Sequence, residues 1–158
     1  MKKKKYIPKE GDIFRYLITS GDENNGFTIY GYGRVLNTCT AAFYSNDALP
    51  PRKVGVTASI EQVLALDVAF VVGCTYDGFD SGLYEVIGNV PLENKFKSPI
   101  YFYHRSVAED RCSLFNVWDN SNIQTVHISE MPLHIERWGA YSHIHVEKRL
   151  GIYRGKLA

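Results

Sequence analysis

An alternating apolar segment with two closely spaced glycines most constrains how this chain can fold. Residues 27–38 alternate in the way expected of a β-strand, and Gly31 and Gly33 fall on the same face of it. Glycine leaves that face without side chains, which predicts a sharp bend or a close crossing of backbone, as small closed barrels require. The segment therefore predicts a β-rich fold.

Other short apolar segments predict further strands, because turn-forming residues separate them. Residues 19–26 are rich in Gly, Asn and Asp, and they should join a strand at 13–18 to the strand at 27–38 as a hairpin. Residues 119–122 are a polar loop that predicts a second hairpin. The other expected strands, including the arms of the second hairpin, are residues 41–44, 68–76, 83–88, 100–104, 112–118 and 123–128.

Two segments predict helices. Ser59 and Gln62 have the spacing of a capping box, in which the serine oxygen accepts a hydrogen bond from the amide three residues on, so a short helix should run to about residue 66. Ser142 can cap a second helix near the end of the chain. The apolar residues that recur there at helical spacing are Val146, Leu150 and Tyr153.

The composition is that of a globular protein. The chain has 158 residues, of which 45% are hydrophobic and 22% charged, and these values exclude wholesale disorder. This length predicts a single domain over residues 1–158, with residues 1–8 as a flexible basic terminus. The expected class is α+β: a mostly antiparallel sheet, partly closed into a small barrel, with one or two short helices.

The near-neutral net charge conceals an acidic body. Four of the 18 Lys and Arg residues form the run Lys2–Lys5, so the rest of the chain carries 14 against 17 Asp and Glu, a net charge of −3. A nucleic-acid-binding protein usually concentrates positive charge on its folded surface. The charge distribution therefore predicts that nucleic acid is not a partner.

The sequence also predicts a cytoplasmic protein that has no membrane contact. No apolar region follows the lysine run, and the most apolar stretch, residues 68–72, is far too short to span a bilayer. Cys39, Cys74 and Cys112 are widely spaced and form no Cys-x-x-Cys pair, which indicates buried free thiols in a reducing compartment.

Catalytic patterns are weak. A metal-dependent phosphotriester hydrolase is one alternative, because His143, His145 and Glu147 would share a face of a strand, although a lone His-x-His is more often structural. There is no Gly-x-Ser-x-Gly elbow, and Cys74 lies in an apolar segment where burial makes a thiol inert. We therefore expect no enzyme activity, no catalytic residues, no metal and no cofactor.

A second alternative is a small nucleic-acid-binding barrel. Tyr30, Tyr32 and Arg34 alternate on one face of the glycine-containing strand, and aromatic rings interleaved with arginine can hold single strands. The tyrosines could equally form cross-strand pairs in a sheet, and the acidic body argues against this function.

The remaining expectation is a protein-binding surface. A mildly acidic body complements a basic partner such as a nuclease. The candidate contacts are Asp22 and Glu23 in one loop, and Asp77, Phe79 and Asp80 in another. Phe79 between two aspartates has the composition of an interaction hot spot, although an ordinary polar turn with Phe79 folded inward accounts for the same residues.

Three segments resemble the immunity protein 26 family of bacterial polymorphic toxin systems. They are Tyr6 followed by Lys9–Phe14, then Tyr32–Leu36, and then Tyr84–Leu92, with a weaker echo at Val146–Leu150. The resemblance implies a cytoplasmic protein that binds and neutralises a cognate toxin. The family name is sometimes coupled with a phosphotriesterase designation, which would require its own metal ligands.

The matched motifs themselves indicate backbone geometry rather than contact with a toxin. Gly11-Asp12 begins a strand, Gly33 lies where backbone approaches closely, and the stretch from Gly88 to Pro91 ends a strand in a turn. The resemblance therefore supplies no catalytic positions.

Overall fold

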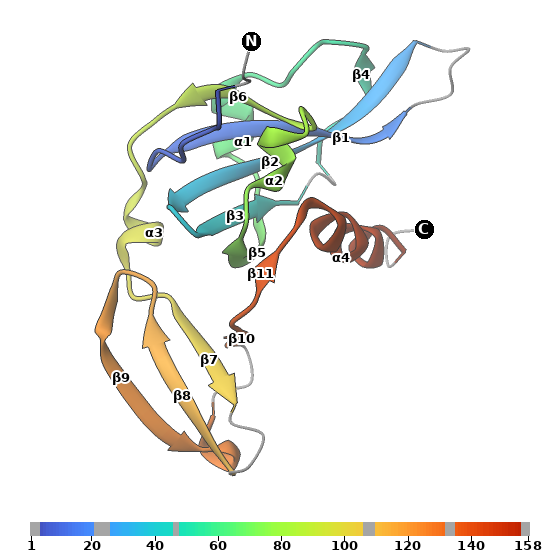
Figure 1. Ribbon diagram of the computed structural model, residues 1–158. Coiled ribbons are helices and arrows are strands. Elements are labelled where there is room, and N and C mark those ends of the chain that lie inside the picture. Colours follow the sequence, from blue (N-terminus) through green and yellow to red (C-terminus); the bar gives the residue numbers. More distant parts are fainter. Residues whose placement is uncertain (1–3, 21–25, 46–47, 106–109, 132–134, 156–158) are drawn as a thin grey trace. The chain divides into compact units, whose positions relative to one another are not determined.

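The computed structural model of the chain contains two compact units, one of residues 1–91 and 140–158 and one of residues 92–139 (Figure 1). The second unit has about 50 residues, close to the size below which a chain rarely folds alone. We therefore keep the single domain of the sequence analysis as a proposal. The residues that the structure describes are 4–20, 26–45, 48–105, 110–131 and 135–155.

The first unit is built on a mostly antiparallel sheet. Its described strands follow the order β11-β5-β3-β2-β1-β6, with β4 paired to β2, and only β11 runs parallel to its neighbour. The α+β class is confirmed, although neither sheet of the described chain closes into a barrel. The strands are β1 (Asp12–Ser20), β2 (Phe27–Asn37), β3 (Thr40–Tyr44), β4 (Arg52–Lys53), β5 (Val68–Cys74), β6 (Tyr84–Asn89) and β11 (Ala140–Tyr141).

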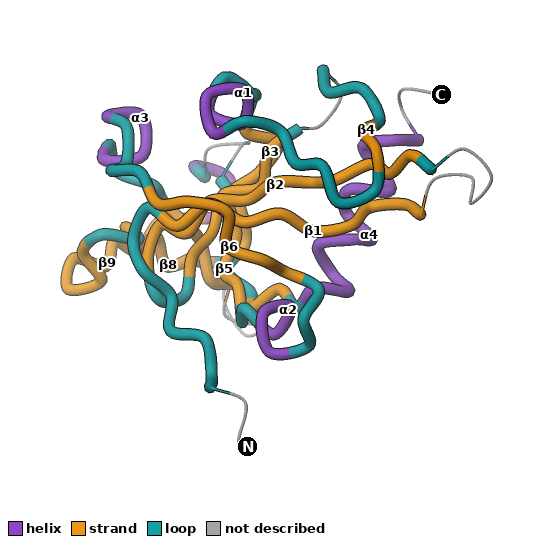
Figure 2. Tube along the Cα trace, turned by 90° about the horizontal axis from the view of Figure 1, so that it is seen from above, coloured by secondary structure: helices purple, strands orange, loops and turns teal. Residues whose placement is uncertain are grey.

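Helices cover both faces of this sheet. α1 (Ile60–Leu64) lies on one face, whereas α2 (Asp77–Asp80) and α4 (His143–Gly155) lie on the other (Figure 2). Side chains alternate along β1, so Ile13 packs toward α1 while Phe14 and Tyr16 pack toward α2 and α4. The α1 face also buries Tyr32, Tyr44, Ala58, Val63 and Leu66, and the α4 face buries Phe43, Phe70, Val72, Val146 and Leu150.

The paired glycines of β2 make room for aromatic rings. Gly33 lies opposite Phe14 and Gly31 opposite Tyr16 in the β1–β2 register. A methyl group at either glycine would overlap the facing ring. The close crossing of backbone predicted from the sequence is wrong at these two glycines, because aromatic rings rather than backbone fill the space.

The helices begin largely where the sequence places them. Ser59 and Gln62 form both hydrogen bonds of a capping box at the start of α1. α4 begins directly after Ser142, and Val146 and Leu150 are buried as expected. The loop predicted to contain Asp77, Phe79 and Asp80 instead forms one helical turn, α2, which follows Tyr76 in the left-handed conformation at φ 56°.

The second unit is a small sheet with strand order β10-β7-β8-β9. Phe102, Phe115 and Trp138 pack ring against ring within it, at centroid distances of 5.2 to 6.1 Å. Its elements are α3 (Asn94–Lys97), β7 (Tyr101–Arg105), β8 (Arg111–Asn116), β9 (Asp119–His127), the 3-10 turn η1 (Ile128–Glu130) and β10 (Glu136–Arg137).

The second hairpin turns earlier than the sequence predicts. The turn contains Val117 and Trp118, and the polar residues 119–122 belong to β9 rather than to a loop. The Asn116 side chain accepts a hydrogen bond from the Trp118 amide at 3.1 Å, and the Trp118 indole donates to the carbonyl of Phe96 at 2.8 Å. These two contacts fix the tight turn two residues before the predicted loop.

The glycine–aromatic contacts predict a strong effect of a single methyl group. Gly33→Ala should lower the free energy of unfolding by about 1–3 kcal/mol, because the ring of Phe14 is fully buried and cannot move aside. Gly139→Ala is the matched control, since nothing lies within 4 Å of its added methyl group. Urea unfolding of both variants measures the difference, and equal stability of the two would contradict this packing.

Candidate functional site

The segments with family-like motifs meet around one buried arginine. Arg34 on β2 is fully buried. Its Nε donates to the carbonyl of Gly11 at 3.2 Å, and its Nη2 donates to the carbonyls of Val90 and Pro91 at 2.7 and 3.1 Å. We call Arg34 and these three carbonyls the Arg34 network. It joins the start of β1, the middle of β2 and the chain that leaves β6.

Gly11 is positioned by backbone contacts inside this network. Its amide donates to Val35, and its carbonyl accepts from the amide of Val90. Its φ is +87°, and a Cβ at this position would overlap the carbonyl oxygen of Val90. The residue must therefore be glycine for two independent reasons, left-handed backbone and close approach.

Asp12 extends the network toward the surface. Its two carboxylate oxygens accept from the Tyr6 hydroxyl at 2.6 Å and from the Asn89 side chain at 2.9 Å. Asn89 also donates to the carbonyl of Glu10. The motif residues therefore serve folding, as the sequence analysis expects of them, and they hold Tyr6 in place.

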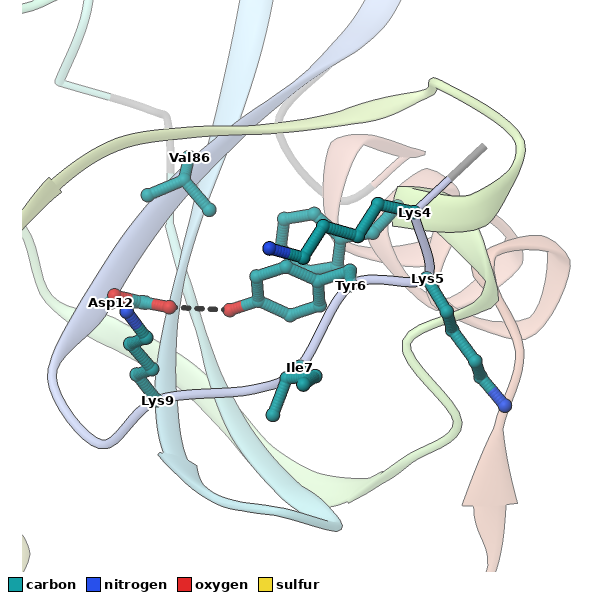
Figure 3. Close-up of a pocket in the computed structure, with 8 residues that line it drawn as sticks. Lys4, Lys5, Tyr6, Ile7, Lys9, Asp12 and Val86 are labelled. Carbon is teal, nitrogen blue, oxygen red and sulfur yellow. Dashed lines mark hydrogen bonds between the residues drawn. The ribbon is translucent and has the colours of Figure 1, made fainter. Parts of the chain in front are cut away.

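Tyr6 forms one wall of an open hollow beside α2 (Figure 3). Its ring stacks on Phe79 with centroids 3.8 Å apart and planes inclined by 20°. Burial and the hydrogen bond to Asp12 raise the pKa of Tyr6 well above its ordinary value, so the hydroxyl remains a donor at neutral pH. We call this site the Tyr6 hollow. Its volume is about 630 Å³, and it is lined by residues 4–7, Lys9, Asp12, Phe79 and Val86.

The structure separates the predicted contact residues. Phe79 lines the Tyr6 hollow and is half-buried against the core, which combines the two alternatives considered for it. Asp80 is exposed at the end of α2. Asp22 and Glu23 lie outside the described residues. The sequence did not indicate that Ile7, Lys9 and Val86 would line a hollow with Phe79, and the family-like segment that begins at Tyr6 was the available signal for this region.

The Asp77 side chain connects α2 to the beginning of α4 through contacts with His143. Its Oδ1 accepts from the backbone amide of His143 at 2.8 Å, and its Oδ2 lies 2.6 Å from the His143 Nδ1. Burial alone would raise the pKa of Asp77, but the hydrogen bonds from His143 and from the Thr75 hydroxyl lower it overall. Asp77 is thus a carboxylate that caps a helix from a distant part of the chain.

The histidines proposed as metal ligands are separate from one another. The His143 Nδ1 is engaged with Asp77, and the His145 Nδ1 lies 2.9 Å from the Ser142 hydroxyl. Glu147 is exposed on α4. Among the residues that the structure describes, no three His, Cys, Asp or Glu side chains are grouped as a metal site requires. His143, His145 and Glu147 lie on a helix rather than on the strand face that would bring them together.

The face expected to stack nucleic-acid bases is buried. Tyr32 and Arg34 are at most 1% exposed, and the Tyr32 hydroxyl accepts from the amide of Ala58. The guanidinium of Arg15 lies 4.7 Å from the ring centroid of Tyr30. The prediction of Tyr30, Tyr32 and Arg34 as a stacking surface is wrong, because residues around Ala58 and α1 cover this face of the sheet.

The cysteines are free, and Cys74 and Cys112 are buried as predicted, whereas the predicted burial of Cys39 is wrong because this residue is exposed. Burial raises the pKa of the Cys74 thiol to about 12, which removes its nucleophilic character at neutral pH. No helix in the described ranges combines the length and the apolar character needed to cross a membrane.

A model of the family described as immunity protein 26 matches residues 9–113, about two thirds of the chain. The chain belongs to the immunity protein 26 family. The span that matches the immunity protein 26 family contains every residue of the Arg34 network, whereas Tyr6 and the predicted echo at 146–150 lie outside it. Comparison with curated proteins and with solved structures gives no match.

The Arg34 network predicts that lysine cannot replace arginine in this immunity protein 26 family member. Arg34→Lys keeps the charge but loses the planar guanidinium that donates to carbonyls on two segments. The free energy of unfolding should therefore fall by about 3 kcal/mol. Arg105→Lys, an exchange at an exposed position, should change it by less than about 0.5 kcal/mol. Thermal and urea unfolding check both values. A similar stability of the two variants would show that the network does not hold the fold.

Proposed function

We propose that this protein binds a cognate toxin and neutralises it by occlusion, without changing a covalent bond. The observation that carries the proposal is the match to the immunity protein 26 family over residues 9–113. The proposed setting is a bacterial polymorphic toxin system, and the proposed location is the cytoplasm, where three free cysteines would stay reduced.

The chemistry of the described residues supports a non-catalytic role. Asp77 and His143 are engaged with each other in capping α4, and His145 is hydrogen-bonded to Ser142 at the same helix end. Cys74 is buried with a raised pKa. These four residues, which could otherwise act as bases or nucleophiles, are therefore hydrogen-bonded within the fold or buried in it.

The proposed contacts are those on α2. Phe79 presents part of its ring at the Tyr6 hollow, and Asp80 is exposed beside it. Asp77 remains in the proposed set, although its carboxylate also holds α4. An exposed acidic residue next to an aromatic ring fits a partner that has positive charge, such as a nuclease, because opposite charges speed encounter and select orientation.

Co-expression tests the proposal. The toxin encoded beside this protein should arrest growth when expressed alone, and wild-type protein should restore growth. Growth arrest in the presence of soluble protein and a verified toxin pairing would contradict the function.

A pair of charge reversals tests the predicted contact on α2. Asp80→Lys should weaken binding of the toxin about tenfold, because it removes an opposite charge from the interface and introduces a like one. Asp67→Lys makes the same change at another exposed aspartate and should leave the affinity within about twofold. Isothermal titration calorimetry measures both affinities. Equal effects of the two variants would show that Asp80 is not part of the interface.

A further inference from the structure

The Tyr6 hollow gathers apolar surface that the fold leaves exposed. Ile7 is 69% exposed and Val86 40%, and both line the hollow together with the half-buried ring of Phe79. Its volume of about 630 Å³ falls in the range of roughly 300–1,000 Å³ that is typical of ligand pockets. The hollow is therefore large enough to receive apolar side chains of a partner.

Two aromatic walls of the hollow are held by contacts within the fold. Tyr6 is fixed at its hydroxyl by Asp12 and at its ring by Phe79, which in turn contacts Phe14 and Tyr84 of the core. Preformed walls reduce the conformational entropy that binding would otherwise cost.

The charge around the hollow is positive. Lys4, Lys5 and Lys9 line it, against the single carboxylate of Asp12. Both oxygens of Asp12 already accept hydrogen bonds from Tyr6 and Asn89. Figure 3 shows the Lys4 side chain extending across the hollow, whereas that of Lys5 extends away from it.

The ammonium groups of the three lysines form no ion pair with a described residue. In the part of the chain that the structure describes, no ion pair or side-chain hydrogen bond engages Lys4, Lys5 or Lys9. A positive rim over an apolar floor complements a ligand that is both acidic and apolar. A basic segment of a partner would be repelled at the same place.

We propose that the Tyr6 hollow is the docking site for an acidic segment of the toxin. An apolar or aromatic side chain of that segment packs on Tyr6, Phe79 and Val86 while its carboxylates pair with Lys4 and Lys9. This inference rests on the proposed function for the identity of the partner. Together with Asp80 on α2, the lysines would give the interface charges of both signs, which fixes the orientation of the bound toxin.

The first test uses a defined probe and does not require the toxin. The peptide acetyl-Glu-Phe-Glu-Asp-amide, titrated into the full chain labelled with nitrogen-15, should shift the amide signals of residues 4–7, Lys9, Phe79 and Val86. The double variant Lys4→Glu/Lys9→Glu should lose these shifts, whereas Lys53→Glu, an exposed lysine on β4, should keep them. The oligonucleotide dT10 serves as a second probe. Shifts that are absent with the peptide, or stronger with dT10, would overturn the proposal.

The second test measures the affinity for the neighbouring toxin at 50 and 200 mM NaCl. Lys4→Glu/Lys9→Glu should weaken binding about 100-fold and reduce its dependence on salt, while Lys53→Glu should stay within about twofold of wild type. An unchanged affinity of the double variant would overturn the docking site and leave the immunity function standing. Peptide shifts without any binding of the toxin would overturn the immunity function and leave the acidic-ligand site standing.

Discussion

The first unit depends on the hydrogen bonds that the buried guanidinium of Arg34 donates. A charge removed from water costs several kcal/mol unless hydrogen bonds compensate it. Here the compensation comes from backbone carbonyls of two segments. They are the carbonyl of Gly11 before β1 and the carbonyls of Val90 and Pro91 after β6. The network therefore holds three segments that are distant in the chain, and it requires glycine at position 11.

The candidate site follows from that network. Gly11 places Asp12 at the start of β1. The Asp12 carboxylate accepts one hydrogen bond from the Asn89 side chain and another from the hydroxyl of Tyr6, which holds Tyr6 in place. Tyr6 then stacks on Phe79 and forms a wall of the hollow. The buried residues of the Arg34 network build the scaffold, while the proposed contacts with the toxin lie at the surface, and most of both sets fall within the span that matches the family.

Local patterns predicted the parts of the fold that depend on neighbours in the sequence. The capping box at Ser59 and the helix that contains Val146 were predictable because their contacts span only a few residues. The burial of Tyr32 was not, because residues near Ala58 cover it through tertiary contacts that alternation cannot reveal. Tyr6 and Phe79 are more than 70 residues apart, so their stacking could not be predicted either. For this reason the sequence indicated Phe79 but not the hollow around it.

The claim that matters most is that neutralisation occurs by equimolar binding. Titration of active toxin with this protein, followed by intact-mass measurement of both chains, tests it directly. We expect toxin activity to fall linearly to its end point at equimolar protein, independently of incubation time, with both masses unchanged. Time-dependent inactivation by a small fraction of an equivalent, or a toxin of altered mass, would contradict the account.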